Sequence, residues 1–341
     1  MALTECCETK SPKTSTDDVL SPQISHDIEK HHGAVIGDVE RLGRIRPDLF
    51  ATAIGEVSFV AIVIMSLMTA EYFTSGFNTL LPHLSKAINI PDKDRTWPTA
   101  MPNLAASAFL LPFARLCDRY GGRAVFLGGH AWLFVWSVAC GFSSDLVPII
   151  VCRSMQGIGF AAFLPANLAL LGHIYRPGPR KNLVYCIYGA FSCVGFYVGI
   201  LSAGISIELL SWRWYFWIGS VIEFIIVVAG LFAIPRQLND VNRLASMDWW
   251  GLCTITPGLA LMVFAFTGGG HAPDGWRTPY IYVSLTLGIL LLLAAVYTQG
   301  WVASQPLLPK RLFQPKFMAR VMGSLYACGG CYSCFLFYSS L

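Results

Sequence analysis

The sequence predicts an all-α protein that spans a membrane. Of its 341 residues, 55% are hydrophobic and only 13% are charged, a share too small to cover a soluble chain of this length. The charged residues gather in short stretches between long, continuous apolar runs. Only helices and closed barrels satisfy every backbone hydrogen bond in lipid, and continuous apolar runs lack the alternation of barrel strands. Helical spans separated by wetted loops therefore fit the pattern.

A bilayer core of about 30 Å takes roughly 20 helical residues. Residues 1–50 hold no apolar run, and their polar composition predicts a disordered cytosolic tail without a signal peptide. The rest of the chain predicts about nine spans, at residues 56–81, 97–117, 124–142, 147–174, 183–208, 214–234, 249–267, 280–300 and 318–341.

Lysine and arginine residues orient these spans. With a cytosolic N-terminus, five of them lie in outer loops (Lys86, Lys93, Arg95, Arg213, Arg277) and twelve in inner loops (Arg115, Arg119, Arg123, Arg176, Arg180, Lys181, Arg236, Arg243, Lys310, Arg311, Lys316, Arg320). This bias follows the positive-inside rule, so we predict that the N-terminus is cytosolic. Nine spans would then end outside, within an apolar run, and we expect a chain that is truncated at its C-terminal end.

The loop between the second and third spans reads Ala-Arg-Leu-Cys-Asp-Arg-Tyr-Gly-Gly-Arg over residues 114–123. Gly121 permits a sharp turn, and Asp118 can accept hydrogen bonds from an arginine or a helix N-terminus. The stretch resembles the G-x-x-x-D-R-x-G-R-K/R signature of the major facilitator superfamily, with Ala114 in place of the first glycine. The resemblance implies a gate loop that contains Asp118, Arg119, Gly121 and Arg123. The alternative is an ordinary basic loop.

The fourth span contains Arg153, Gln156, Gly157 and Gly159 in the order R-x-x-Q-G-x-G-x-A. An arginine at the centre of a span costs about 2.5–3.5 kcal/mol on insertion scales, so it must face a cavity or a partner. The stretch resembles a signature of the proton-driven drug antiporters. That resemblance implies that Arg153 influences the protonation of a nearby carboxylate. Snorkelling of Arg153 to the headgroups is the alternative.

The fifth span has small residues at helical spacing. Gly195 and Gly199 form a G-x-x-x-G pair, and Gly204 follows. Such spacing permits close helix–helix contact. The span resembles the antiporter signature G-x-x-x-G-P-x-x-G-G, with Ile200 in place of proline, and a plain packing interface is the alternative.

Later tracts resemble the fourteen-span drug:proton antiporter branch of the same superfamily. They include the tryptophan-rich stretch 211–216, Thr-Pro-Gly-Leu at 256–259 and Gln-Pro-Leu-Leu-Pro at 305–309, and the first span is most similar to fungal relatives of the aminotriazole-resistance and low-affinity ammonium transporters. The resemblance implies a six-helix bundle over residues 51–235, a linker with two extra spans over 236–301, and the start of a second bundle over 302–341.

Two carboxylates lie inside predicted spans, Glu71 and Glu223. Each would be costly if it were ionised and faced lipid, so each is a candidate for proton coupling. We favour Glu71 acting together with Arg153, whereas a structural hydrogen bond is the alternative for Glu223. Four amides could line the cavity or bond between helices, namely Asn78, Asn103, Gln156 and Asn167.

These observations predict a proton-coupled carrier of a drug, toxin or secondary metabolite. The alternatives are a small-ion or nutrient permease, for example for ammonium, and a truncated, non-transporting sensor or partner. We expect no cofactor, no metal, no nucleic acid and no enzymatic activity; Cys328, Cys331 and Cys334 lack a fourth ligand at useful spacing. The expected partners are lipid, protons and a small molecule, and we expect a monomer in the plasma membrane, with the vacuolar membrane as the alternative.

Overall fold

The computed structural model describes residues 43–236, 248–270, 272, 275–302 and 316–339. The described part contains nine α-helices and no strand. Two short 3-10 helices, Asp92–Asp94 and Gly275–Arg277, precede the α-helices that begin at Thr96 and Pro279, and a π-helical turn, Thr298–Val302, follows the α-helix that ends at Tyr297. The α-helices are α2 (Ala53–Ala87), α3 (Thr96–Tyr120), α4 (Gly122–Gly141), α5 (Leu146–Ile174), α6 (Pro179–Leu209), α7 (Trp212–Ala233), α8 (Trp249–Gly269), α9 (Pro279–Tyr297) and α10 (Lys316–Ser339).

The first eight of the nine predicted spans are confirmed to within a few residues at most helix ends. Eight helices, α2 to α9, are long and apolar enough to cross a membrane, whereas α10 is not among these eight. The largest difference among these eight lies at the C-terminal end of α2, which extends to Ala87 and was expected to end at residue 81. Thr52 caps the start of α2, because its Oγ1 accepts a hydrogen bond from Gly55 N at 3.2 Å.

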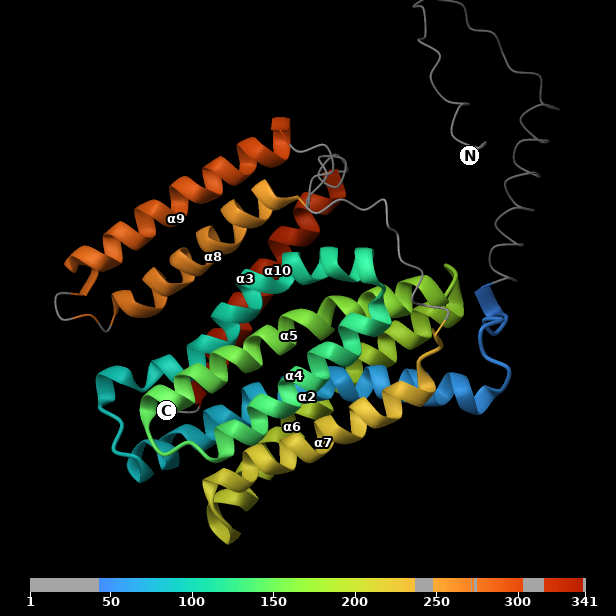
Figure 1. Ribbon diagram of the computed structural model, residues 1–341, viewed down its shortest axis with the longest axis horizontal. Coiled ribbons are helices and arrows are strands. Elements are labelled where there is room, and N and C mark those ends of the chain that lie inside the picture. The colour runs from blue at the N-terminus through green and yellow to red at the C-terminus, as the bar shows by residue number, and fades with distance from the viewer. Residues whose placement is uncertain (1–42, 237–247, 271, 273–274, 303–315, 340–341) are drawn as a thin grey trace, which may run out of the picture.

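Helices α2 to α7 lie side by side in a bundle, and α8 and α9 form a separate hairpin (Figure 1). Within the bundle, α2 packs mainly on α6 and α7, and α5 packs on α3 and α4. The hairpin rests on α3 through α8, where the Trp97 and Phe264 rings lie 5.4 Å apart between centroids. Asp248 closes the hairpin, since it caps α8 through Gly251 N and also accepts a hydrogen bond from Gln299.

The contact between α2 and α6 depends on two glycines of α6, Gly195 and Gly199. A Cβ atom added to Gly195 would lie 2.6 Å from Met68 Cα, and one added to Gly199 would lie 2.7 Å from Tyr72 O. Both glycines therefore allow the two backbones to approach closely. The expectation for Gly204 is wrong. A Cβ there meets nothing within 4 Å in the part of the chain that the structure describes, so Gly204 does not take part in the contact.

Two tyrosines join α2 to α7 in the middle of this core. Tyr72 donates a hydrogen bond to Tyr215 O at 2.8 Å, and Tyr215 donates one to Tyr72 O at 2.7 Å. Their rings are stacked, with centroids 4.9 Å apart, and both side chains are almost fully buried. Each hydroxyl in the apolar interior thus has a partner, which removes the cost of burying it.

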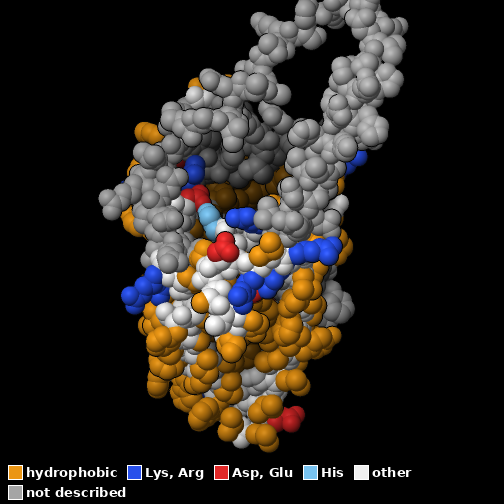
Figure 2. All heavy atoms as spheres, turned by 90° about the vertical axis from the view of Figure 1, so that its right-hand side faces the viewer, with side chains coloured by type: hydrophobic (Ala, Val, Ile, Leu, Met, Phe, Trp, Pro, Cys, Tyr) orange, Lys and Arg blue, Asp and Glu red, His pale blue; other side chains and the backbone are white. Residues whose placement is uncertain are grey.

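Basic side chains gather at one end of the bundle, here called the basic end and defined by Arg115, Arg119, Arg123, Arg176 and Arg180. Figure 2 shows this end, with Lys and Arg grouped on it and hydrophobic side chains over the flanks. The apolar flanks include large exposed residues such as Leu201 and Phe232. A charged end and apolar sides are what a helix bundle in a bilayer requires.

Candidate functional site

Arg153 lies in the interior of the bundle and does not snorkel to its surface. The side chain is 1% exposed. Its Nε donates to Pro98 O on α3 at 3.3 Å, its Nη1 donates to Gln156 Oε1 at 3.0 Å, and its guanidinium carbon lies 4.1 Å from the centre of the Phe77 ring. Gln156 in turn donates to Ser137 Oγ on α4 at 3.0 Å. The motif on α5 therefore links four helices.

The charge of Arg153 has no carboxylate partner among the described residues. A carbonyl, an amide oxygen and an aromatic face supply its contacts. An isolated buried cation costs several kcal/mol, and these neutral groups offset only part of that cost. In this conformation the charge of Arg153 is therefore held by neutral groups alone among the described residues.

Gly157 and Gly159 let neighbouring helices approach this part of α5. A Cβ on Gly157 would overlap Pro102 of α3, and one on Gly159 would lie 3.1 Å from Leu133 Cβ of α4. The two glycines thus hold α3 and α4 against the helix that carries Arg153.

Glu71 lies on α2 and faces α6. It is half-buried, and Ser192 Oγ donates a hydrogen bond to its Oε1 at 3.2 Å. Glu71 and Arg153 have different partners, and no ion pair joins them in the described part of the chain. Their joint action in proton coupling stays a prediction.

Glu223 has a partner that the sequence analysis missed. Its Oε2 lies 2.6 Å from His130 Nδ1 on α4, and both side chains are fully buried. The other ring nitrogen, His130 Nε2, lies 2.7 Å from Ser66 Oγ on α2. One signal could have found His130, because an ionisable residue in the middle of a predicted span is a candidate by the rule applied to Glu223.

The hydrogen bonds continue from Ser66 to two further helices. Asn167 on α5 lies within reach of Ser66 Oγ through both of its amide atoms, with Oδ1 at 3.2 Å and Nδ2 at 3.0 Å. Asn167 Nδ2 also donates to Tyr188 OH on α6 at 3.3 Å. Five helices of the bundle contribute one side chain each to this chain of contacts.

The four amides predicted for the cavity divide into two kinds. Gln156 and Asn167 are fully buried and hydrogen-bond between helices, which was the alternative for each of them. Asn78 is half-buried and Asn103 is exposed. Only these last two have surface that a substrate could contact in this conformation.

The turn between α3 and α4 is tight, and Gly121 makes it. Its φ of 86° lies in the region that favours glycine. Asp118 pairs with Arg115 one turn earlier on its own helix, with 3.6 Å between Nη1 and Oδ2, and Arg119 lies over the Tyr120 ring. Arg123 is the buried member of the loop. It is 7% exposed, and its Nη2 donates to Leu231 O on α7 at 2.8 Å.

A second polar cluster joins three helices at the basic end. Arg180 on α6 forms two hydrogen bonds to the buried carboxylate of Glu56 on α2, of 2.8 and 2.5 Å. Tyr175, directly after α5, donates to Glu56 Oε1 at 3.0 Å, and burial together with this bond raises the pKa of Tyr175. A bidentate arginine–carboxylate pair fixes orientation as well as distance.

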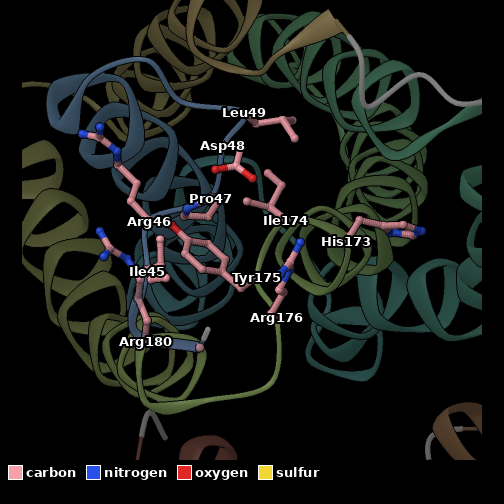
Figure 3. A pocket seen from close by; sticks show the side chains of 11 residues that line it. Ile45, Arg46, Pro47, Asp48, Leu49, His173, Ile174, Tyr175, Arg176 and Arg180 are labelled. Carbon is pink, nitrogen blue, oxygen red and sulfur yellow. The ribbon is translucent and has the colours of Figure 1, made fainter. Parts of the chain in front are cut away.

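A pocket of about 310 Å³ lies beside this cluster. Its lining comes from the segment before α2 and from the end of α5 and start of α6, and includes Asp48, Tyr175, Arg176 and Arg180 (Figure 3). In this view His173 points away from the other labelled side chains. The first α5 residue that lines the pocket, His173, follows Arg153 by 20 residues, so the pocket is distinct from the buried arginine site.

Comparisons with known proteins agree with the resemblance. Residues 60–341 match the Major Facilitator Superfamily. The chain is 35% identical to the low affinity ammonium transporter of Saccharomyces cerevisiae over 63% of the chain and 42% of that protein. It is 30% identical to the aminotriazole resistance protein of the same yeast over 86% of the chain and 55% of that protein. With the efflux pump terJ of Aspergillus terreus it shares 29% identity over 92% of the chain and 61% of the pump.

Solved structures give the same fold. A crystal structure of the peptide transporter POT in complex with sulfate superposes with a TM-score of 0.54 at 15% identity, and the match covers 76% of this chain and 55% of that one. The chain spans about half the length of the curated relatives that it matches.

Proposed function

Because the chain belongs to the Major Facilitator Superfamily, we propose that it is part of a proton-coupled carrier that exports a small organic compound by alternating access. The buried arginine of the antiporter-like motif is the observation that carries this proposal. Arg153 is 1% exposed and has no carboxylate partner within the described residues, so a helix movement that opens this site would present an unneutralised cation to a carboxylate or an anionic ligand.

Glu71 is the acid that we assign to the exchange. It lies half-buried on α2, where Ser192 Oγ is the only group of the described residues that donates a hydrogen bond to its carboxylate. A carboxyl group in such a place binds a proton when it faces the apolar interior and releases it when water or a cation approaches. Movement of α2 against α5 and α6 would change the surroundings of the Glu71 carboxyl group, and this change would cause it to release its proton.

Aminotriazole is a suitable probe, since one relative is named for resistance to this compound and another is an efflux pump. Expression in a yeast strain sensitive to aminotriazole should restore growth on it. Glu71→Gln and Arg153→Ala should abolish this gain, whereas Glu208→Gln, which removes an exposed carboxylate at the far end of α6, should leave it intact. Equal resistance in all four strains would refute the roles of Glu71 and Arg153.

Ammonium uptake is the second candidate, favoured by the 35% identity to the low affinity ammonium transporter. Uptake of labelled methylammonium in the same strains distinguishes the ammonium permease from the export carrier. Uptake without aminotriazole resistance would favour the permease, and the absence of both would favour a chain that acts as a sensor or partner of a complete carrier.

We also propose an orientation and a location. The basic end faces the cytosol, as the lysine and arginine distribution requires, and the N-terminus lies on the same side in the plasma membrane. An N-terminal epitope tag should react with antibody only after the cells are permeabilised. The carrier acts as a monomer without cofactor or enzymatic step, and light scattering in detergent should give the mass of a single chain.

A further inference from the structure

His130 and Glu223 form a pair of ionisable side chains in the buried interior of the bundle. Both side chains have no exposed surface, and 2.6 Å separates His130 Nδ1 from Glu223 Oε2. The His130 ring is enclosed by aromatic rings, with centroids 4.5 Å from Phe126 and 4.3 Å from Phe163. The pair joins α4 to α7, and neither of these two helices carries Glu71 or Arg153.

The contacts around the pair can be satisfied in two protonation states. When the imidazole is neutral with its proton on Nδ1, Nε2 accepts from the Ser66 hydroxyl, and Asn167 Nδ2 donates to Ser66 Oγ at 3.0 Å. When the ring is an imidazolium, Nε2–H donates to Ser66 Oγ, and the hydroxyl turns to donate to Asn167 Oδ1 at 3.2 Å. Ser66 and Asn167 thus reverse their roles as one proton arrives.

The charge of the pair changes by one unit in the same step. With a neutral imidazole and an ionised carboxyl the pair carries −1, and with an imidazolium it is a neutral ion pair. Glu223 Oε1 has no hydrogen-bond partner in the part of the chain that the structure describes, so no second donor from that part stabilises the ionised carboxylate. A fully buried site of this kind responds strongly to the gain or loss of a proton.

Charged and titratable groups on the helices around the pair are bonded elsewhere. Arg123 of α4 bonds to Leu231 O, Arg153 of α5 to Pro98 O and Gln156, and Tyr215 of α7 to Tyr72 O. On α2, Glu71 bonds to Ser192, and Tyr188 of α6 meets the pair only through Asn167. Within the described residues, His130 and Glu223 are therefore each other's only charged partners.

We propose that the His130–Glu223 pair binds a proton during transport and that Ser66 and Asn167 transmit its charge state to α2, α5 and α6. The inference rests on the proposed function and deepens it, because it assigns a second proton site on helices α4 and α7. The proton enters as the ring takes up a second N–H, and it leaves when the ring returns to the neutral form. No other bond is made or broken.

The first test measures protonation and needs no substrate. The chain, labelled with nitrogen-15 histidine and held in lipid nanodiscs, is titrated by NMR over about pH 5–8. Among the signals of the seven histidines, the one that vanishes in His130→Gln should change between the singly and doubly protonated forms, and it should respond differently to pH in Glu223→Gln and Ser66→Ala. His83→Gln, which removes an exposed histidine, should leave it unchanged. Because Glu223→Gln is isosteric, it assigns the signal even where His130→Gln does not fold.

The second test measures coupling in proteoliposomes with aminotriazole as the probe. His130→Gln and Glu223→Gln should lower gradient-driven accumulation by at least about fivefold, the lower end of typical coupling between two sites. Exchange of the probe at equal pH should persist, because the arginine site on α5 remains.

The two tests separate failure of the inference from failure of the proposed function. A His130 ring that keeps one protonation state throughout the titration overturns the inference, whatever the chain transports. Unchanged gradient-driven accumulation in both variants overturns it too. A titrating pair in a wild-type chain that moves no probe supports the proton site and contradicts the transport proposal alone.

Discussion

Replacing Gly199 by alanine should loosen the bundle at a defined place. The new Cβ would lie 2.7 Å from Tyr72 O and 2.9 Å from Tyr72 Cα, and neither backbone atom can turn aside as a side chain end can. Helices α2 and α6 must then move apart, which would stretch the bond from Ser75 Oγ to Phe196 O, now 2.8 Å. Overpacking of this kind costs about 1–3 kcal/mol.

Gly204→Ala is the matched control on the same helix. A Cβ at Gly204 meets nothing within 4 Å in the described part of the chain. Alanine also gains about 1 kcal/mol of helix propensity over glycine, and this gain cancels when the two variants are compared. The difference between them is therefore the overpacking cost of about 1–3 kcal/mol alone.

Thermal unfolding in detergent, followed by tryptophan fluorescence, measures this difference. At about 2–4 °C for each kcal/mol, Gly199→Ala should unfold about 2–12 °C below Gly204→Ala. Equal midpoints for the two variants would refute the close α2–α6 contact, since the structure allows no other place for the added methyl group at Gly199.

Three further changes test other contacts of the bundle. Arg180→Ala should destabilise the fold by about 2–4 kcal/mol, because it leaves Glu56 buried without its cation, and adding Glu56→Gln should recover much of the loss in the same unfolding assay. Tyr215→Phe should cost about 0.6–1.5 kcal/mol through the lost bond to Tyr72 O, and a larger loss would contradict a single hydrogen bond. Arg153→Lys should unfold at a lower temperature than wild type, because a lysine lacks the planar guanidinium that bonds to Pro98 O and to the Gln156 amide oxygen at once. An unchanged unfolding temperature would argue against both bonds.

The sequence predicted the features that depend on local pattern. Apolar runs of about 20 residues located the helices, and Gly121 marked the turn where φ is 86°. Arg153 could be placed in the interior because its motif has a specific spacing. These signals lie within one segment each, so one sequence is enough to recognise them.

Other features could not be predicted from the sequence, or were predicted incorrectly, and most of these depend on contacts between helices. Glu223 had no visible partner, because His130 precedes it by 93 residues and the two meet only when α4 packs on α7. The prediction for Gly204 failed for a local reason instead, because Gly204 lies five residues after Gly199 and so points about 140° around α6 from that contact face. The bond from Arg123 to Leu231 O likewise needs the packed bundle.

Proton-driven transport is the central claim, and proteoliposomes that contain the wild-type chain test it most directly. Aminotriazole accumulation in the lumen is measured with an acidic lumen, without a gradient, and with the same gradient collapsed by a protonophore. The account predicts accumulation against its own concentration only while the gradient persists, together with a rise in the pH of the acidic compartment. Accumulation that is equal under all three conditions would contradict it.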